Sequence, residues 1–203
     1  MDETFHAGLE FHERPVIGDI HRCPEKLLAA EEKVIDILLN DCITTCRAMN
    51  RTGVSLPLHR GSDGFISIPV FEKFYWPQLK KLILGLIDAG ITPSVVWEGN
   101  WDQRLKYLAE LPKGKTIGRF QSSDIFKVKE VLGDTMCIIG GMKVSMLSGG
   151  ATAEEVRAYT KRLCQEVGKG GGFIMAADVS EMESCKPEMI KVWVDATREF
   201  GRY

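Results

Sequence analysis

Residues 91–100 read ITPSVVWEGN, and this stretch decides the fold class. The apolar run at 91–97 predicts a buried β-strand, and the turn residues at 98–100 end it. The amphipathic segment at 101–111 then predicts a helix, which Pro112 stops. A buried strand followed by an amphipathic helix is the repeating unit of a parallel α/β sheet.

The same unit recurs along the chain. A helical pattern follows each of the predicted strands, which cover residues 53–58, 91–97, 116–120, 136–140 and 172–176.

Helix boundaries follow from proline and capping residues. Residues 24–50 carry an apolar stripe that includes Val34 and Met49, and further helices are predicted to begin at Pro69 and Pro77. A later helix is predicted to begin at residue 124, with Ser122 or Ser123 as its cap. Another is predicted to begin at residue 153, with a capping box formed by Thr152 and Glu155. The last is predicted to cover residues 187–200.

Successive strand–helix units require right-handed crossovers and therefore a mainly parallel sheet. We predict an α/β fold that is a partial or shortened (β/α)8 TIM-type barrel, because a full barrel normally takes about 250 residues. An open sheet is the alternative. We expect a single domain over residues 1–203, with 1–23 as an N-terminal extension of uncertain structure.

The amino-acid composition argues against some classes of binding partner. The 26 basic and 28 acidic residues give a net charge of −2 without charged blocks, which argues against general nucleic-acid binding. Neither a membrane-spanning run nor a leader is predicted, so we expect a cytoplasmic protein that does not bind membranes. The six cysteines form no CxxC pair and are expected to be reduced.

Ligand sites of parallel sheets lie at the carboxyl ends of the strands, where loops and helix N-termini converge. We therefore predict His59 and Glu98 as catalytic residues. The predicted substrate-binding residues follow the same strand ends: Arg60, Asp63, Trp97, Asn100, Gln121, Asp124 and Asp178.

Two chemistries are open for these groups. His59, Glu98 and Asp178 together could supply nitrogen and oxygen ligands to a divalent metal such as zinc. Alternatively, His59 could act as a general acid or base, because imidazole exchanges protons near neutral pH. The structural alternatives are a hydrogen-bonded loop histidine, and helix-capping roles for Glu98 and Asp124.

From about residue 71 to 203 the chain resembles the uroporphyrinogen decarboxylase superfamily, which includes corrinoid-dependent methyltransferases. The resemblance rests on the order and spacing of several segments. These are FEKFYWPQLKKLILGLIDAGITPSVVWEGN, DIFKVKEVLGD, CIIGGMKVSMLSGGATAEEV, GGFIMAAD and KPEMIKVWVDATREFGRY. It implies that this chain carries the later strands of a (β/α)8 barrel.

The chain departs from family motifs at functional positions. The arginine-bearing segment of the decarboxylases has no match before residue 27, and the histidine that follows their final strand is absent. The zinc-binding methyltransferases carry His-x-Cys-Gly where this chain has Val96, Trp97, Glu98 and Gly99. The resemblance thus favours the methyltransferase branch without its thiolate zinc site.

Three functions follow as hypotheses. The first is methyl transfer between a small methylated substrate and a corrinoid carried on a partner protein. The second is decarboxylation of uroporphyrinogen or another polycarboxylate, for which Arg60, Arg104 and Arg119 are the candidate cations. The third is a non-catalytic or truncated subunit that needs a partner chain, or a homo-oligomer that protects its sheet edges.

Overall fold

A single five-stranded sheet organises the computed structural model, which describes residues 13–177 and 183–202. Its strands lie side by side in chain order, and every neighbouring pair is parallel. They are β1 (Gly53–Leu58), β2 (Thr92–Trp97), β3 (Ile117–Phe120), β4 (Cys137–Gly141) and β5 (Phe173–Ala176). Each predicted strand is confirmed to within one residue at either end.

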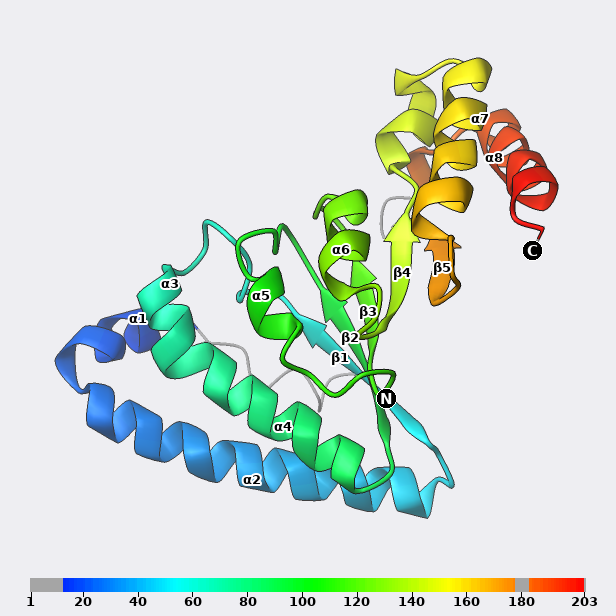
Figure 1. Ribbon diagram of the computed structural model, residues 1–203. Coiled ribbons are helices and arrows are strands. Elements are labelled where there is room, and N and C mark those ends of the chain that lie inside the picture. Colours follow the sequence, from blue (N-terminus) through cyan, green and yellow to red (C-terminus); the bar gives the residue numbers. More distant parts are fainter. Residues whose placement is uncertain (1–12, 178–182, 203) are drawn as a thin grey trace.

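Helices connect the strands and surround the sheet on its outer side (Figure 1). They are α1 (Glu13–Arg22), α2 (Pro24–Ala48), α3 (Ile68–Val70), η1 (Phe71–Tyr75), α4 (Trp76–Asp88), α5 (Leu105–Leu108), α6 (Ile125–Leu132), η2 (Met146–Gly150), α7 (Ala153–Arg162), η3 (Leu163–Val167) and α8 (Pro187–Phe200). The η elements have the wider π-helical hydrogen-bond pattern.

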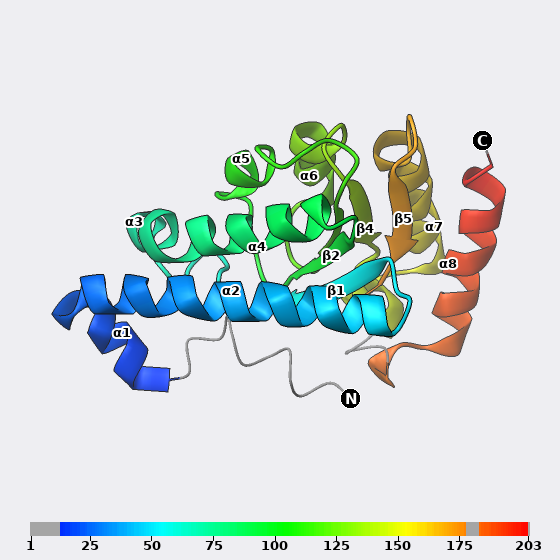
Figure 2. The same ribbon diagram turned by 90° about the horizontal axis from the view of Figure 1, so that it is seen from below.

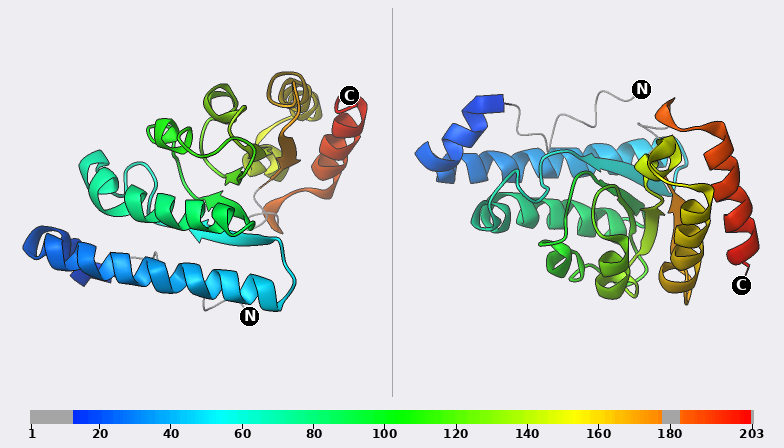
Figure 3. Two further views of the ribbon diagram at one scale, coloured as in Figure 1. Left: turned by 60° about the horizontal axis from the view of Figure 1, so that its bottom comes forward. Right: turned by 90° about the horizontal axis from the view of Figure 1, so that it is seen from above.

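The arrangement is part of a TIM-type barrel, as predicted. In Figure 3 the strands fan around a common centre with helices outside them. Within the described residues β1 and β5 are the edges of the sheet, each with one neighbouring strand. Since a complete barrel of this type closes with eight strands, these five make a partial barrel.

The two faces of the sheet have different environments. In β2 the side chains of Pro93, Val95 and Trp97 are buried, whereas Ser94 and Val96 on the other face are only half-buried. Successive strand residues point to opposite faces, so the buried set faces the helical layer. That layer includes α4, whose apolar stripe is fully buried at Leu79, Leu82, Ile83 and Leu86.

Helix α2 runs beside α4 (Figure 2) and confirms the long helix predicted before the first strand. Its buried residues are Ile35, Cys42 and Cys46. Val34 and Met49 were expected in the same stripe but are 38% and 43% exposed. The prediction was wrong for these two, because α2 buries only the narrow side that faces α4 and β1.

Three helix predictions need correction. Helix α1 occupies part of the segment that was predicted to be an extension of uncertain structure. The prolines predicted to begin two separate helices lie in one continuous helical run, residues 68–88, in which η1 joins α3 to α4. Pro77 has no N–H to bond the carbonyl four residues earlier, which is consistent with the wider turn just before it.

The third correction concerns residues 101–111, where a full helix was predicted and only Leu105–Leu108 is helical. Side chains take the backbone N–H groups of the three residues that begin the segment. The N–H of Trp101 donates to Ser123 Oγ, that of Asp102 to Asn100 Oδ1 and that of Gln103 to Asp63 Oδ2. Such side-chain acceptors favour a turn over a helix.

Of the two side-chain caps predicted for later helices, one is confirmed and one is wrong. Thr152 and Glu155 form the predicted capping box at the start of α7. Helix α6 is capped by Asp124, which accepts from the N–H of Phe126, instead of by Ser122 or Ser123. Ser123 is occupied with the N–H of Trp101.

The cysteines are all free thiols, in line with the prediction. Among the described helices, none has the length and apolar character needed to cross a membrane.

Candidate functional site

His59 and Glu98 meet at the carboxyl ends of two adjacent strands. His59 directly follows β1 and Glu98 directly follows β2, and the register pairs Leu58 with Trp97, the last residues of those strands. His59 Nδ1 contacts Glu98 Oε2. The two side chains are 33% and 28% exposed, so the pair is accessible from solvent while partly enclosed.

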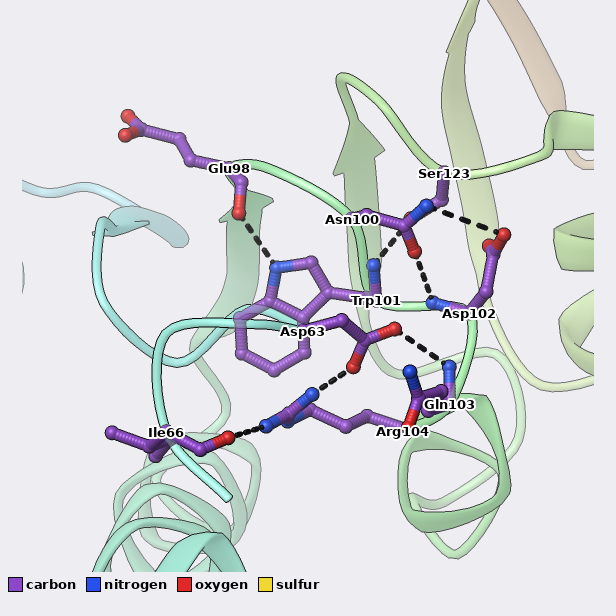
Figure 4. Close-up of polar contacts among 9 residues, drawn as sticks. All are labelled: Asp63, Ile66, Glu98, Asn100, Trp101, Asp102, Gln103, Arg104 and Ser123. Carbon is purple, nitrogen blue, oxygen red and sulfur yellow. Dashed lines mark hydrogen bonds and ion pairs between the residues drawn. The ribbon is translucent and has the colours of Figure 1, made fainter. Parts of the chain in front are cut away.

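The turn after β2 holds Glu98 in place. The indole Nε1 of Trp101 donates to the carbonyl of Glu98 over 2.8 Å, which closes the turn, and the indole itself is fully buried. Gly99 has φ of +75°, and a Cβ there would lie 2.9 Å from the side chain of Ser62. Glycine is therefore required both by the backbone and by the neighbouring loop. In Figure 4 the carboxylate of Glu98 extends away from this turn.

A buried ion pair connects the loop after β1 to the turn after β2 (Figure 4). Arg104, which is 1% exposed, contacts Asp63 through Nη1, donates from Nη2 to the carbonyl of Ile66 and lies 4.9 Å from the ring centroid of Phe71. Asp63 also accepts from the N–H of Gln103. These bonds join the segments that carry His59 and Glu98.

Asp63 is thus a structural residue and not the substrate contact that was predicted. Both of its carboxylate oxygens are occupied by protein donors, Arg104 at one and Gln103 at the other. A carboxylate held in this way orders its loop.

Tyr75 is buried close enough to Glu98 to be affected by its charge. It is 2% exposed, and burial, followed by the negative charge of Glu98, raises the pKa of its phenol well above the ordinary value. A Cβ at Gly61 would lie 2.5 Å from the Tyr75 ring, so the loop after β1 packs directly on it. Phe71, Phe74 and Trp76 from the same segment are core residues.

The structure separates the other predicted residues of these two loops. Trp97 was expected to contact substrate, but it is 0% exposed and packs against Trp101 with ring centroids 4.7 Å apart. Its position in β2 points it to the helical layer, so that prediction was wrong. Arg60 lies over the ring of Phe65, and exposed Asn100 donates to Asp102.

A cavity of about 750 Å³ lies along the same edge of the sheet, beyond the carboxyl ends of β3, β4 and β5. Gln121 and Asp124, both predicted to bind substrate, line it, and Gln121 is exposed there. Asp124 combines this position with its role as the cap of α6. The turn after β2 reaches the cavity through Asp102, which accepts from the N–H of Asp124.

Sequence reasoning missed several residues that line this cavity. Arg119 is not among them: it was already a candidate cation for carboxylate binding, and the structure places it on the inner face of β3, where it lines the cavity. Lys143, Ser145, Tyr159 and Arg162 were not predicted at all. Tyr159 and Arg162 come from α7, and no local sequence signal connects that helix to the end of β3.

The predicted metal site is only partly described. Its third ligand, Asp178, lies outside the described residues, and within those residues there is no group of three His, Cys, Asp or Glu side chains suited to a metal ion. The two described candidates, His59 and Glu98, contact each other.

Comparison with known proteins agrees with this architecture. The family model for uroporphyrinogen decarboxylase (URO-D) matches residues 18–200. Among solved structures, a methyltransferase from Methanosarcina mazei is similar with a TM-score of 0.63 and 17% sequence identity, over 92% of this chain and 54% of that chain. The chain therefore spans about half the length of that methyltransferase, and the likeness shows the fold. No curated protein matches. With the family model covering nearly the whole chain, the protein belongs to the uroporphyrinogen decarboxylase family.

Proposed function

We propose that this chain is an enzyme component that transfers a methyl group between a small methylated substrate and a corrinoid carried by a partner protein. The observation that carries the proposal is the contact between His59 Nδ1 and Glu98 Oε2 at the mouth of the partial barrel. Family membership and the fold of the methyltransferase neighbour support it.

The role assigned to the pair is proton transfer. In this proposal Glu98 holds Nδ1 of His59, and the imidazole exchanges a proton with the substrate. The carboxylate orients the imidazole, as in other histidine–carboxylate pairs. In this proposal His59 is the acid and Glu98 is its positioning partner.

A reduced corrinoid on the partner would supply the nucleophile that accepts the methyl group. The C–O or C–N bond of the substrate breaks, and its electron pair stays on the oxygen or nitrogen. In the proposal His59 delivers a proton to that atom, so the leaving group departs as a neutral alcohol, phenol or amine.

The test is an anaerobic incubation of the protein with a reduced corrinoid protein and a panel of methoxylated and methylated-amine substrates. We expect the visible spectrum of the corrinoid to change on methylation with at least one substrate class. Glu98→Gln should slow the transfer by roughly 100-fold, within the usual range for acid–base catalysis. Glu110→Gln is the matched control, because Glu110 pairs with Lys80 away from the site. Absence of methylation across the panel contradicts the proposal.

The decarboxylase hypothesis receives less support from the placement of its cations. Arg104 is committed to Asp63, and Arg60 lies 5.4 Å over the ring of Phe65. Of the three arginines considered, only Arg119 lines the cavity. Conversion of uroporphyrinogen by the protein would nevertheless restore this hypothesis.

A second candidate is a subunit that a partner chain, or a second copy, completes. It is favoured by the edge strands β1 and β5, each of which has one neighbouring strand among the described residues. Open edges of parallel strands invite pairing with further strands. Light scattering on the purified chain tests it: a stable monomer argues against this candidate, and a dimer or a requirement for co-expressed partner argues for it.

A further inference from the structure

The cavity beyond β3, β4 and β5 has two cations that its own acids do not neutralise. The acids in its wall are Asp102 and Asp124, and both are engaged with the N-terminus of α6. Asp102 accepts from the N–H of Asp124, and Asp124 accepts from the N–H of Phe126. Of the cations, Arg162 is paired with Glu166 over 2.7 Å. Arg119 and Lys143 are the two cations of the cavity wall that have no carboxylate partner among the described residues.

Arg119 stands on the inner face of the sheet. Its register neighbours are Val96 on β2 and Ile139 on β4, both apolar. Among the described residues it makes neither an ion pair nor a hydrogen bond, and it is half-buried. A guanidinium flanked by apolar side chains and partly removed from water is stabilised when an anion binds to it.

Lys143 approaches from the loop after β4. Its Nζ lies 5.6 Å from the ring centroid of Tyr159, and the described residues offer it no carboxylate. The Tyr159 hydroxyl donates to the carbonyl of Gly141, which fixes the ring in the cavity wall. The lysine is therefore positioned by an aromatic face and keeps its donors for a ligand.

The wall also limits the kind of anion. Phosphate typically binds the free N–H groups at the start of a helix, but at α6 the side chains of Asp102 and Asp124 already occupy two of them. Their two negative charges also disfavour a dianion. A carboxylate carries one charge and matches the planar fork of an arginine.

Apolar surface in the same cavity indicates what the carboxylate is attached to. Phe126 and Tyr159 both line it and meet edge to face, with ring centroids 6.2 Å apart. Arg162 Cζ lies 4.1 Å from the ring centroid of Phe126 and Lys143 lies over Tyr159, so a planar apolar ligand would pack against the ring surface that these cations leave open. The volume of about 750 Å³ is ample for one aromatic ring with substituents.

We propose that this cavity binds an aromatic carboxylic acid, with Arg119 and Lys143 holding the carboxylate. The inference deepens the proposed function by naming the substrate class, a methylated aromatic acid. That the acid is a substrate rests on the proposed function. Its binding does not, because binding requires no corrinoid.

The test is isothermal titration of the purified chain with 4-methoxybenzoate and with the uncharged 4-methoxybenzamide. We expect the acid to bind and the amide to bind at least tenfold more weakly. Arg119→Gln and Lys143→Gln should each weaken binding of the acid by roughly 10-fold or more, the usual effect of losing a charged hydrogen bond. Arg119→Lys should fall between wild type and Arg119→Gln, because it keeps the charge and loses the fork.

Lys127→Gln is the matched control, because Lys127 is exposed on α6 and does not line the cavity. Its affinity for the acid should equal that of wild type, and circular dichroism melts should show that every variant is folded. Equal binding of acid and amide, equal weakening by Lys127→Gln, or displacement of the acid by equimolar inorganic phosphate would overturn the inference. Binding without methyl transfer would count against the proposed function alone.

Discussion

Replacing Asp63 with alanine should destabilise the protein strongly, because it leaves the guanidinium of Arg104 without its carboxylate. Arg104 is 1% exposed and cannot turn to water without unpacking from Phe71. Removing one partner of a buried ion pair typically costs about 3–5 kcal/mol. On a scale of roughly 2–4 °C per kcal/mol for a protein of this length, the unfolding midpoint falls by about 10 °C.

The assay is thermal and urea unfolding followed by tryptophan fluorescence, since Trp97 and Trp101 are buried beside the pair. Asp195→Ala is the control, because it removes an exposed carboxylate that pairs with Lys191 within α8. It should leave the midpoint unchanged within error. The double variant Asp63→Leu with Arg104→Met removes both charges and should be more stable than Asp63→Ala.

The reasoning is refuted if Asp63→Ala unfolds within about 1 kcal/mol of wild type, the scale of an exposed pair. It is also refuted if the double variant is less stable than Asp63→Ala, because the cost would then come from packing and not from an orphaned charge. Since this ion pair joins the loops of His59 and Glu98, Asp63→Ala should also weaken ligand binding at the site.

Two further predictions concern α2 and the turn after β2. Both carboxylate oxygens of Glu31 are buried without a hydrogen-bond partner in the described residues, and burial raises its pKa from 4.5 to about 7. The folded protein therefore holds this proton more tightly than the unfolded chain, and its stability falls as the pH rises from about 5 through 7. Glu31→Gln should remove that dependence and raise the free energy of unfolding at pH 8 by about 1–2 kcal/mol, a value already reduced for partial screening by water. Urea unfolding at pH 5 and pH 8 measures the effect, and equal pH profiles for both proteins would contradict the prediction. Gly99→Ala should lower the free energy of unfolding more than Gly114→Ala does. Both glycines have positive φ, but only at Gly99 would the new Cβ meet a neighbour, Ser62 at 2.9 Å. The excess should be about 1–3 kcal/mol by thermal unfolding, and equal losses would show that the loop after β1 yields freely.

The strands were predictable because the information for them is local. Residues 92–97 alternate between a helix-facing and an inner set, and the polar and glycine residues at 98–100 follow them. The same locality placed His59 and Glu98 at one edge, since parallel strands end on the same side of the sheet.

The failures came from contacts between residues far apart in the chain. The helix predicted at 101–111 is cut short by acceptors at Asp63 and Ser123, which lie 40 and 22 positions from the N–H groups they bind. Asp63 looked like a site residue for the same reason, because nothing in its own loop revealed Arg104 as its partner. Local sequence patterns do not predict contacts between residues that are far apart in the chain.

In the cavity, too, some residues could be predicted from local sequence and others only from the packed structure. Gln121 and Asp124 were predicted from their positions after β3. Lys143 could have been proposed from the loop after β4, but the partner ring of Tyr159 lies on α7, and only the packed structure brings them together.

The most direct test of the acid–base pair is a double-mutant cycle in single-turnover methyl transfer, using the substrate that the panel identifies. Rates are measured for wild type, His59→Gln, Glu98→Gln and the double variant. If the two residues act as one unit, the double variant should be no slower than His59→Gln, with each single loss near 100-fold. Independent losses that multiply in the double variant, or a His59→Gln protein as fast as wild type, would contradict the account.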